Sequence, residues 1–307
     1  MIGLVLRRLA LGVLTLFCVY AATFLMVMVI PGNPFSSAER TMPPEVVRAL
    51  ESRYSMDNPG KYFFQFLAGA LRFDFGPSFQ YRDWTCAQII GHALPVSITV
   101  GLLAMLLAVA VGVPVGVLSA VRRNGWFDLT TIGFVLLGIS LPTFVTGTAL
   151  LIIFAIHLQM LPIGGWGTVW HLPLPAATLS LPFMAYIARL TRIGMLDVLS
   201  SDFIRTAQAK GLPRRAVVWK HAFKIAFLPV LSFLGPATAQ ALTGSFVVEK
   251  VFSVPGMGQH FVDSALNLDR GLILATVLVY AAIIVTFNFV VDCLYVLVDP
   301  RTVEPHA

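Results

Sequence analysis

Residues 129–188 read LTTIGFVLLGISLPTFVTGTALLIIFAIHLQMLPIGGWGTVWHLPLPAATLSLPFMAYIA, a run that contains no Asp, Glu, Lys or Arg. A membrane-spanning helix needs about 20 apolar residues to cross roughly 30 Å of hydrocarbon, so this run is too long for one crossing. Glycine and proline interrupt it at 159–167, near Trp166 and Trp170, and tryptophan gathers at membrane surfaces. The run therefore predicts two spans, near 132–157 and 173–193, joined by a turn at a membrane surface.

Outward from this run, the same criterion finds four further apolar, charge-poor stretches. They lie near 9–30, 96–119, 225–248 and 271–297. The first is too long for the apolar part of a secretory signal and has no Ala-x-Ala cleavage site, so we expect it to be retained. The sequence thus predicts an all-α integral membrane protein with six transmembrane helices.

The composition agrees with a membrane protein and excludes an ordinary soluble enzyme. Of the 307 residues, 57% are hydrophobic and 12% are charged, and the mean hydropathy is +0.83. Soluble domains carry about 25% charged residues. The net charge of +6 is best explained by basic residues held at a cytoplasmic membrane face, so we expect a lipid bilayer and no nucleic acid as its surroundings. The three cysteines form neither a disulfide framework nor a metal-binding set.

The distribution of Lys and Arg sets the expected orientation, because basic residues concentrate in short cytoplasmic segments. With the N-terminus inside, the inner segments hold Arg7, Arg8, Arg122, Arg123, Arg189, Arg192, Arg205, Lys210, Arg214, Arg215, Lys220, Lys224 and Arg301. The short outer segments hold only Lys250 and Arg270. Both terminal segments, 1–8 and 299–307, are therefore expected in the cytoplasm. The long segment 31–95, with a helix predicted over 43–51, is expected on the outer side.

The cytoplasmic loop 194–224 contains the most informative local pattern, SSDFIRTAQAKGLP at 200–213. Ser200, Ser201 or Asp202 can cap the start of a helix by accepting a backbone N–H. Gly211 suits a left-handed exit from that helix, and Pro213 ends it and can open a second helix that runs to residue 227. The pattern therefore predicts a short helix, a sharp corner and a second helix.

Two interpretations of this loop differ in its partner. A basic loop can simply lie on anionic lipid. However, Ala207 and Ala209 are small enough to let another protein approach closely, and a rigid corner can transmit a displacement. We therefore favour docking of a protein partner over lipid binding.

Several motifs together resemble a known family. RTAQAKGL at 205–212 and HAFKIAFLP at 221–229 resemble the "EAA" loop of ABC-importer permeases, in the variant of the oligopeptide/dipeptide permease B subunits. Further matching segments are PGNP at 31–34, DFGPS at 74–78, GSFVVE at 244–249, VPGMG at 254–258, VDCLY at 291–295 and DPR at 299–301. Two departures from the general motif are Arg205 in place of its glutamate and a longer interval from Gly211 to Leu228. The resemblance covers nearly the whole chain and is strongest to the oligopeptide branch.

The resemblance implies a type I ABC importer permease fold in a bacterial inner membrane. It also implies a second homologous permease, two cytoplasmic ATPase subunits that bind ATP and Mg²⁺, and an extracytoplasmic binding protein that delivers peptides. By this resemblance the loop helix docks on an ATPase subunit, with Ala207, Ala209 and Gly211 at the close approach. The residues of the implied coupling loop are Arg205, Thr206, Ala207, Ala209, Lys210, Gly211 and Pro213.

The chain itself has no sign of catalytic chemistry. It lacks a phosphate-binding Gly-x4-Gly-Lys-Ser/Thr loop and a His-Glu-x-x-His motif, and no nucleophile and base share one membrane depth. We therefore expect no cofactor, no metal and no enzymatic activity on this chain.

Asp292 is the clear ionisable residue within a predicted span, and Asn288 lies one helical turn before it on the same face. They could line the inner mouth of the pathway or form a hydrogen bond that packs helices together. We favour the packing role. Pro114, Pro142, Pro182 and Gly235-Pro236 are candidate bends within spans.

Other functions remain open at this point. Relatives of the same fold import dipeptides, nickel chelates or haem, and the residues alone do not distinguish these cargoes. An ion-coupled secondary transporter would need several ionisable groups at the membrane midplane, and the spans provide one, off centre. An intramembrane enzyme is disfavoured by the missing catalytic set.

Overall fold

The computed structural model describes residues 2–31, 45, 58–81 and 83–298. These residues are mostly helical, and their only β-type pairing is an isolated antiparallel bridge between Pro77 and Thr85. The helix expected over 43–51, except for Glu45, and the tail 299–307 lie outside the described part. The chain divides into two compact units, residues 1–97 with 255–285 and residues 98–254 with 286–307.

Unit 1 is held together by aromatic rings from its first two helices. Tyr20 of the N-terminal helix stacks on Phe66 with ring centroids 5.9 Å apart, and its hydroxyl donates a hydrogen bond to the Phe63 carbonyl at 2.7 Å. Phe24 packs edge-on against Phe63 at 5.0 Å. The helices that contribute to unit 1 are α1 (Ile2–Val29), α3 (Pro59–Ala70), the start of α4 (Cys86–Val121), α13 (Met257–Leu266) and the start of α14 (Arg270–Val298).

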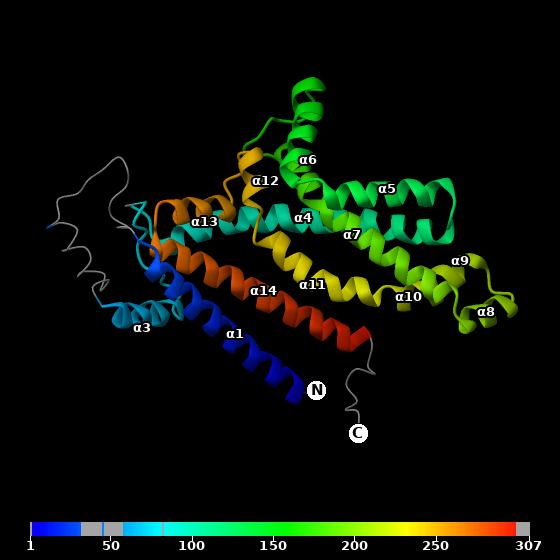
Figure 1. Ribbon diagram of the computed structural model, residues 1–307, viewed down its shortest axis with the longest axis horizontal. Helices are drawn as coiled ribbons and strands as arrows, with labels where there is room; N and C mark the ends of the chain where they lie inside the picture. Colours follow the sequence, from blue (N-terminus) through cyan, green and yellow to red (C-terminus); the bar gives the residue numbers. More distant parts are fainter. Residues whose placement is uncertain (1, 32–44, 46–57, 82, 299–307) are drawn as a thin grey trace. The chain divides into compact units, whose positions relative to one another are not determined.

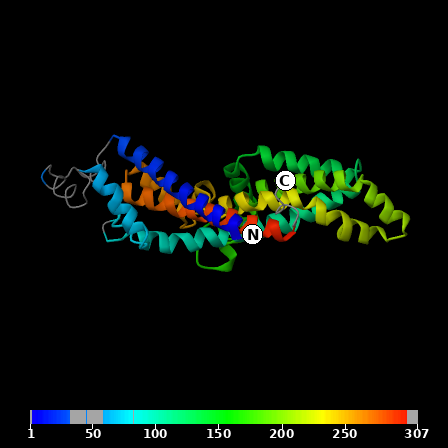
Figure 2. The ribbon, with the colours of Figure 1, turned by 90° about the horizontal axis from the view of Figure 1, so that it is seen from below.

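Unit 2 is organised around α7 (Pro173–Leu199), which contacts several other helices of the unit (Figures 1 and 2). Among them are α5 (Trp126–Ser140), α6 (Thr143–Leu150), α10 (Phe223–Ala226), α11 (Leu228–Leu242) and α12 (Phe246–Val251). Unit 2 also contains the π-helix η1 (Leu151–His157), the 3-10 turn η2 (Val169–His171), α8 (Asp202–Ala209), α9 (Arg214–Ala216), the π-helix η3 (Val217–Ala222), and the parts of α4 and α14 that follow residues 97 and 285.

Glycines let the helices of unit 2 approach α7 at backbone distance. A Cβ added at Gly116 of α4 would lie 2.5 Å from the Ala188 carbonyl oxygen. On α7 itself, a Cβ at Gly194 would lie 2.6 Å from the Ala226 carbonyl oxygen of α10. Close packing of this kind is typical of helices in lipid, where apolar surface alone does not drive association.

Three described helical segments are individually long and apolar enough to cross a membrane: Leu6–Val29, Cys86–Val121 and Arg270–Val291. Two bent pairs raise this number to five if each pair is one span. The predicted span 173–193 falls within α7, which has 27 residues but does not reach the same apolarity because of its prolines and arginines. The count of six spans therefore stays a prediction.

The span expected over 132–157 is bent by 109° between α5 and the segment Thr143–His157. Leu141 has extended backbone angles (φ −78°, ψ 129°), as proline disfavours the α conformation in the residue before it. Pro142 then precedes the first residue of α6. The candidate bend at Pro142 is confirmed, and a continuous helix over this range is excluded.

The span expected over 225–248 also differs from a single helix. It is bent by 53° between Arg214–Ala226 and Leu228–Leu242, with Pro229 in the first turn of α11, where a missing N–H costs least. The helix ends at Leu242 rather than at 248, and Gly244 follows with a φ of +81°. In unit 1, α4 begins at Cys86, ten residues before the predicted start at 96.

The close approach of α4 to α7 can be tested with a Gly116→Ala variant. We expect it to lower the free energy of unfolding by about 1–3 kcal/mol, because the added methyl group meets backbone and the Thr191 side chain. The matched control is Gly133→Ala on α5, where a Cβ has no neighbour within 4 Å and alanine should stabilise the helix by up to about 1 kcal/mol. Thermal unfolding in nanodiscs would measure both, and equal effects would contradict the close approach.

Candidate functional site

The candidate site is α8 with the corner that follows it. In both views of the chain, α8 and α9 lie beyond the ends of α7 and α10 within unit 2 (Figures 1 and 2). Ser201 is the residue before the helix, but its hydroxyl donates to the Val198 carbonyl at 2.6 Å and caps nothing. The Ser200 hydroxyl likewise donates to the Asp197 carbonyl at 2.8 Å. The expected side-chain cap is therefore wrong, and Asp202 acts only through its charge in the first turn.

The corner after α8 follows the sequence pattern. Gly211 has a φ of +74°, and its N–H donates to the Gln208 carbonyl at 2.9 Å. A Cβ at Gly211 would have open space around it, so only the left-handed backbone calls for glycine. Pro213 is extended (ψ 139°) and directly precedes α9. The expected helix, corner and second helix are all present, with the second helix running over Arg214–Ala226.

One side of α8 is buried and the other is open. Ile204 is fully buried and anchors the helix, which packs against η3. Ala207 is half-buried, whereas Ala209 is exposed. The other expected coupling residues, Arg205, Thr206, Lys210, Gly211 and Pro213, are all exposed.

Phe203 is a residue that the sequence reasoning missed. Its side chain is 44% exposed on a helix that is otherwise polar or small-sided on its open face. Large aromatic side chains dominate the energetics of protein interfaces. The signal available in the sequence was an aromatic residue within a charged and polar loop. By contrast, the ion pair between Arg205 and Asp202 at 3.4 Å is highly exposed and contributes little.

A buried carboxylate, that of Asp128, joins α4, α5 and α7. Asp128 of α5 is 1% exposed and accepts from Arg192 of α7 through Nε at 2.6 Å and Nη2 at 2.9 Å. The Ser119 hydroxyl of α4 donates to the same carboxylate at 2.5 Å, and the Asn124 N–H donates at 3.0 Å. Three helices thus share one charged centre, which is fully hydrogen-bonded as a buried charge requires.

The sequence analysis did not identify this pair, because Asp128 directly precedes the charge-free run and Arg192 was assigned to the inner basic cluster. The signal was the position of both charges at matching ends of two neighbouring spans. A second link joins the same region: Arg214 Nη2 donates to the Val121 carbonyl at the end of α4 at 3.2 Å. The helix that follows the corner is therefore tied to α4.

The two residues proposed for the inner mouth are only partly described. Asn288 is half-buried at a contact between α14 and α11, where a Cβ at Gly235 would lie 3.3 Å from its side-chain oxygen. The side chain of Asp292 lies outside the described residues. Neither role for this pair is tested.

Residues 112–304 match the model of a family described as "Binding-protein-dependent transport system inner membrane component". The chain belongs to this family. It is 43% identical, over 98% of its length and 99% of theirs, to the oligopeptide transport system permease proteins OppB of Salmonella typhimurium and Escherichia coli K12. It is also 41% identical to the dipeptide permease DppB of Bacillus subtilis, over 94% of this chain and 93% of that one.

A solved structure extends the family assignment to the fold. Inward-facing structures of the MetNI methionine ABC transporter contain a chain that superposes with a TM-score of 0.55 at 18% identity, covering 69% of this chain and 96% of that one. The expected type I ABC importer permease fold and the inner-membrane location are confirmed. The family assignment also places this chain among the permease subunits.

The Asp128–Arg192 pair predicts an order of stabilities among charge variants. We expect Arg192→Gln to lower the free energy of unfolding by roughly 3–5 kcal/mol, because it leaves Asp128 buried without its partner. The double variant Asp128→Asn with Arg192→Gln should be less destabilised, since no uncompensated charge remains.

The control for this series is Asp202→Asn, which removes an exposed ion pair and should change stability by less than about 0.5 kcal/mol. Thermal unfolding in nanodiscs of these three variants and of Asp128→Asn alone gives the comparison. A double variant as unstable as the sum of the two single variants would contradict the shared charged centre.

Proposed function

We propose that this chain is one of two homologous permease subunits that together line a membrane pathway for importing oligopeptides. The observation that carries the proposal is its similarity to oligopeptide permeases over 98% of the chain. Dipeptides are the second candidate cargo, supported by the 41% identity to dipeptide permeases. Membership of a binding-protein-dependent family argues against an ion-coupled secondary transporter.

The energy for transport is supplied by two cytoplasmic ATPase subunits that bind ATP and Mg²⁺. Each grips the coupling helix of one permease, which in this chain is α8. Support for this role comes from the open face of α8, the fixed left-handed corner at Gly211 and the buried anchor Ile204. A rigid helix held on one side can transmit a displacement to the helices behind it. In this role Phe203 and Ala209 contact the ATPase directly, and Arg205 and Lys210 make charge-assisted contacts.

An extracytoplasmic binding protein delivers the peptide, and this chain needs no cofactor of its own. Selectivity resides mainly in that binding protein, because an apolar and charge-poor wall makes weak, uniform contacts with varied side chains. Asn288 and Asp292 act within this scheme as helix-packing residues near the inner end of α14, supported by the position of Asn288 beside Gly235.

The proposed orientation places α8 inside the cell and α13 outside it. In a background without the three native cysteines, we expect Ala209→Cys to react with a membrane-impermeant maleimide in inside-out vesicles but not in spheroplasts. Ala265→Cys on α13 is a matched exposed alanine and should show the reverse pattern. The same pattern for both positions would overturn the six-span topology with cytoplasmic termini.

The coupling role predicts that a bulky charge on α8 uncouples ATP hydrolysis from transport. We expect Ala207→Glu to reduce stimulation of ATPase activity by loaded binding protein at least tenfold in proteoliposomes. Ala207 is half-buried, and a glutamate there would push a partner surface away from the helix.

The control substitution is Ala265→Glu, the same change on an exposed helical alanine of α13. It should leave stimulation unchanged when both variants assemble with their ATPase subunits in equal yield. Normal stimulation of ATPase activity by loaded binding protein in Ala207→Glu would contradict the assignment of α8 as the coupling helix.

A further inference from the structure

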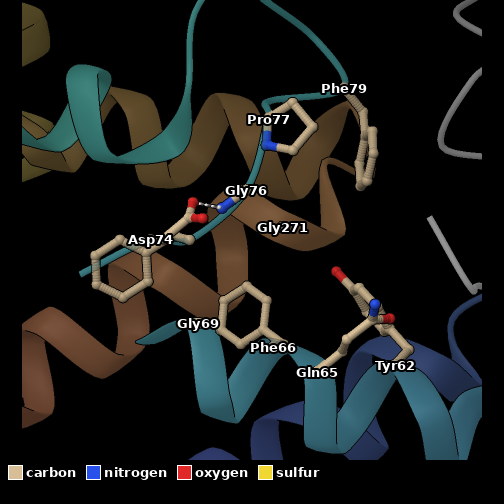
Figure 3. Close-up of a pocket in the computed structure, with 10 residues that line it drawn as sticks. Tyr62, Gln65, Phe66, Gly69, Asp74, Gly76, Pro77, Phe79 and Gly271 are labelled. Atoms are coloured by element: carbon tan, nitrogen blue, oxygen red, sulfur yellow. Dashed lines mark hydrogen bonds between the residues drawn. The ribbon is translucent and has the colours of Figure 1, made fainter. Parts of the chain in front are cut away.

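A cavity of about 230 Å³ lies in unit 1 between α3, the loop 74–79 and the first turn of α14 (Figure 3). The loop is the DFGPS motif, to which the proposed transport function assigns no task. The cavity is lined by Tyr62, Gln65, Phe66, Gly69, Asp74, Phe75, Gly76, Pro77, Phe79 and Gly271. Among these ten lining residues, Asp74 carries the sole charge.

The carboxylate of Asp74 is held in a fixed position. The Asp74 N–H donates to the Gly69 carbonyl at 3.0 Å, and its side-chain Oδ1 accepts the Gly76 N–H at 3.1 Å (Figure 3). Gly76 has a φ of +74°, which closes this tight turn. Oδ2 makes no hydrogen bond to any described residue, so it can accept from a ligand.

Aromatic rings form the rest of the wall. Tyr62, Phe66 and Phe75 are buried, with ring centroids 6.1 Å apart for Tyr62–Phe66 and 6.3 Å apart for Phe66–Phe75. Phe79 stands at the opposite side of the cavity and is half-buried (Figure 3). Burial raises the pKa of the Tyr62 phenol, which therefore stays neutral and can both donate and accept hydrogen bonds.

A second carboxylate, the fully buried Asp269, holds the loop that carries Asp74 through hydrogen bonds. Oδ2 of Asp269 accepts the Ser78 hydroxyl at 2.5 Å and the N–H groups of Phe79 and Gln80 at 3.0 and 3.1 Å. Its Oδ1 accepts the Leu272 N–H at 3.1 Å at the start of α14. The walls of the cavity are thus preorganised, which lowers the cost of binding.

We propose that this cavity binds a primary ammonium or guanidinium group at the end of an aliphatic chain. A carboxylate with an open oxygen provides a charge-assisted hydrogen bond, and aromatic faces attract a cation through their quadrupole. The aliphatic stem packs against Phe66 and Pro77. One carboxylate is too few for Ca²⁺, which takes six or more oxygen ligands, and the negative charge disfavours an anion.

The source of this cation rests on the proposed function. In the proposed topology the cavity lies on the outer side of the membrane, where the binding protein arrives and the peptide is released. Two sources share the required chemistry: a lysine or arginine side chain of the binding protein, and a basic group of the transported peptide.

The direct test is binding of agmatine, a four-carbon chain with ammonium and guanidinium ends, to the assembled transporter in nanodiscs. Saturation-transfer NMR should show saturable binding that n-butylamine displaces and the neutral n-butanol does not. Asp74→Asn should weaken binding at least tenfold, and Phe79→Leu should weaken it severalfold. Asp83→Asn, an exposed acid of the same segment outside the cavity, should have no effect.

Thermal unfolding of each variant separates loss of the site from loss of the fold, and Phe79→Leu provides a second probe if Asp74→Asn is unstable. Absence of saturable binding to the wild-type transporter, or equal binding to Asp74→Asn, would overturn the proposal. This result does not depend on transport, so it is distinct from a failure of peptide uptake, which would overturn the proposed function instead.

Two further measurements identify the source of the cation. If the binding protein supplies it, Asp74→Asn should weaken docking of binding protein loaded with a neutral peptide. If the peptide supplies it, the variant should instead slow uptake of lysine- or arginine-containing peptides at saturating binding protein while sparing neutral ones.

Discussion

Three helices of unit 2 depend on the buried carboxylate of Asp128. The Asp128 carboxylate accepts hydrogen bonds from a hydroxyl of α4, a backbone N–H of the connecting turn, and two nitrogens of the Arg192 guanidinium of α7. An unpaired carboxylate would not be stable there, so each helix is held by its contribution to the same centre. Glycines such as Gly116 bring the same helices within backbone contact. These contacts fix the position of α7, and α8 follows directly on α7, so they also determine where α8 lies.

Much of the fold could be predicted from the sequence because the membrane imposes a simple length and apolarity requirement. The helix ends near residues 29, 173 and 270 agree with the charge and proline pattern. The bend at Pro142 was predicted as a candidate, whereas the 53° bend before Leu228 and the early end of α11 at Leu242 were not predicted. Hydropathy alone does not locate these breaks, and only Pro142, Pro229 and Gly244 give a local signal.

The candidate site likewise has features that the local sequence predicts and features that it does not. The left-handed corner at Gly211 and the helix that begins after Pro213 could be predicted, because glycine readily adopts a positive φ and proline has a fixed φ. The absence of a side-chain cap at Ser201 was not predictable, because a serine hydroxyl can bond to the preceding turn equally well. The Asp128–Arg192 pair joins residues 64 positions apart, and such a long-range contact leaves no trace in local periodicity.

The connection between the corner and α11 contains one more feature with a mechanical consequence. The six residues of η3 follow a π rather than an α pattern, inside a helix that otherwise runs continuously over Arg214–Ala226. A π turn holds one residue more than an α turn and is the less favourable of the two. Converting it to an α turn would swivel everything beyond it by about 100°, one residue's worth of helical rotation. A change of η3 from π to α hydrogen bonding would therefore rotate the rest of this helix in one step of fixed size.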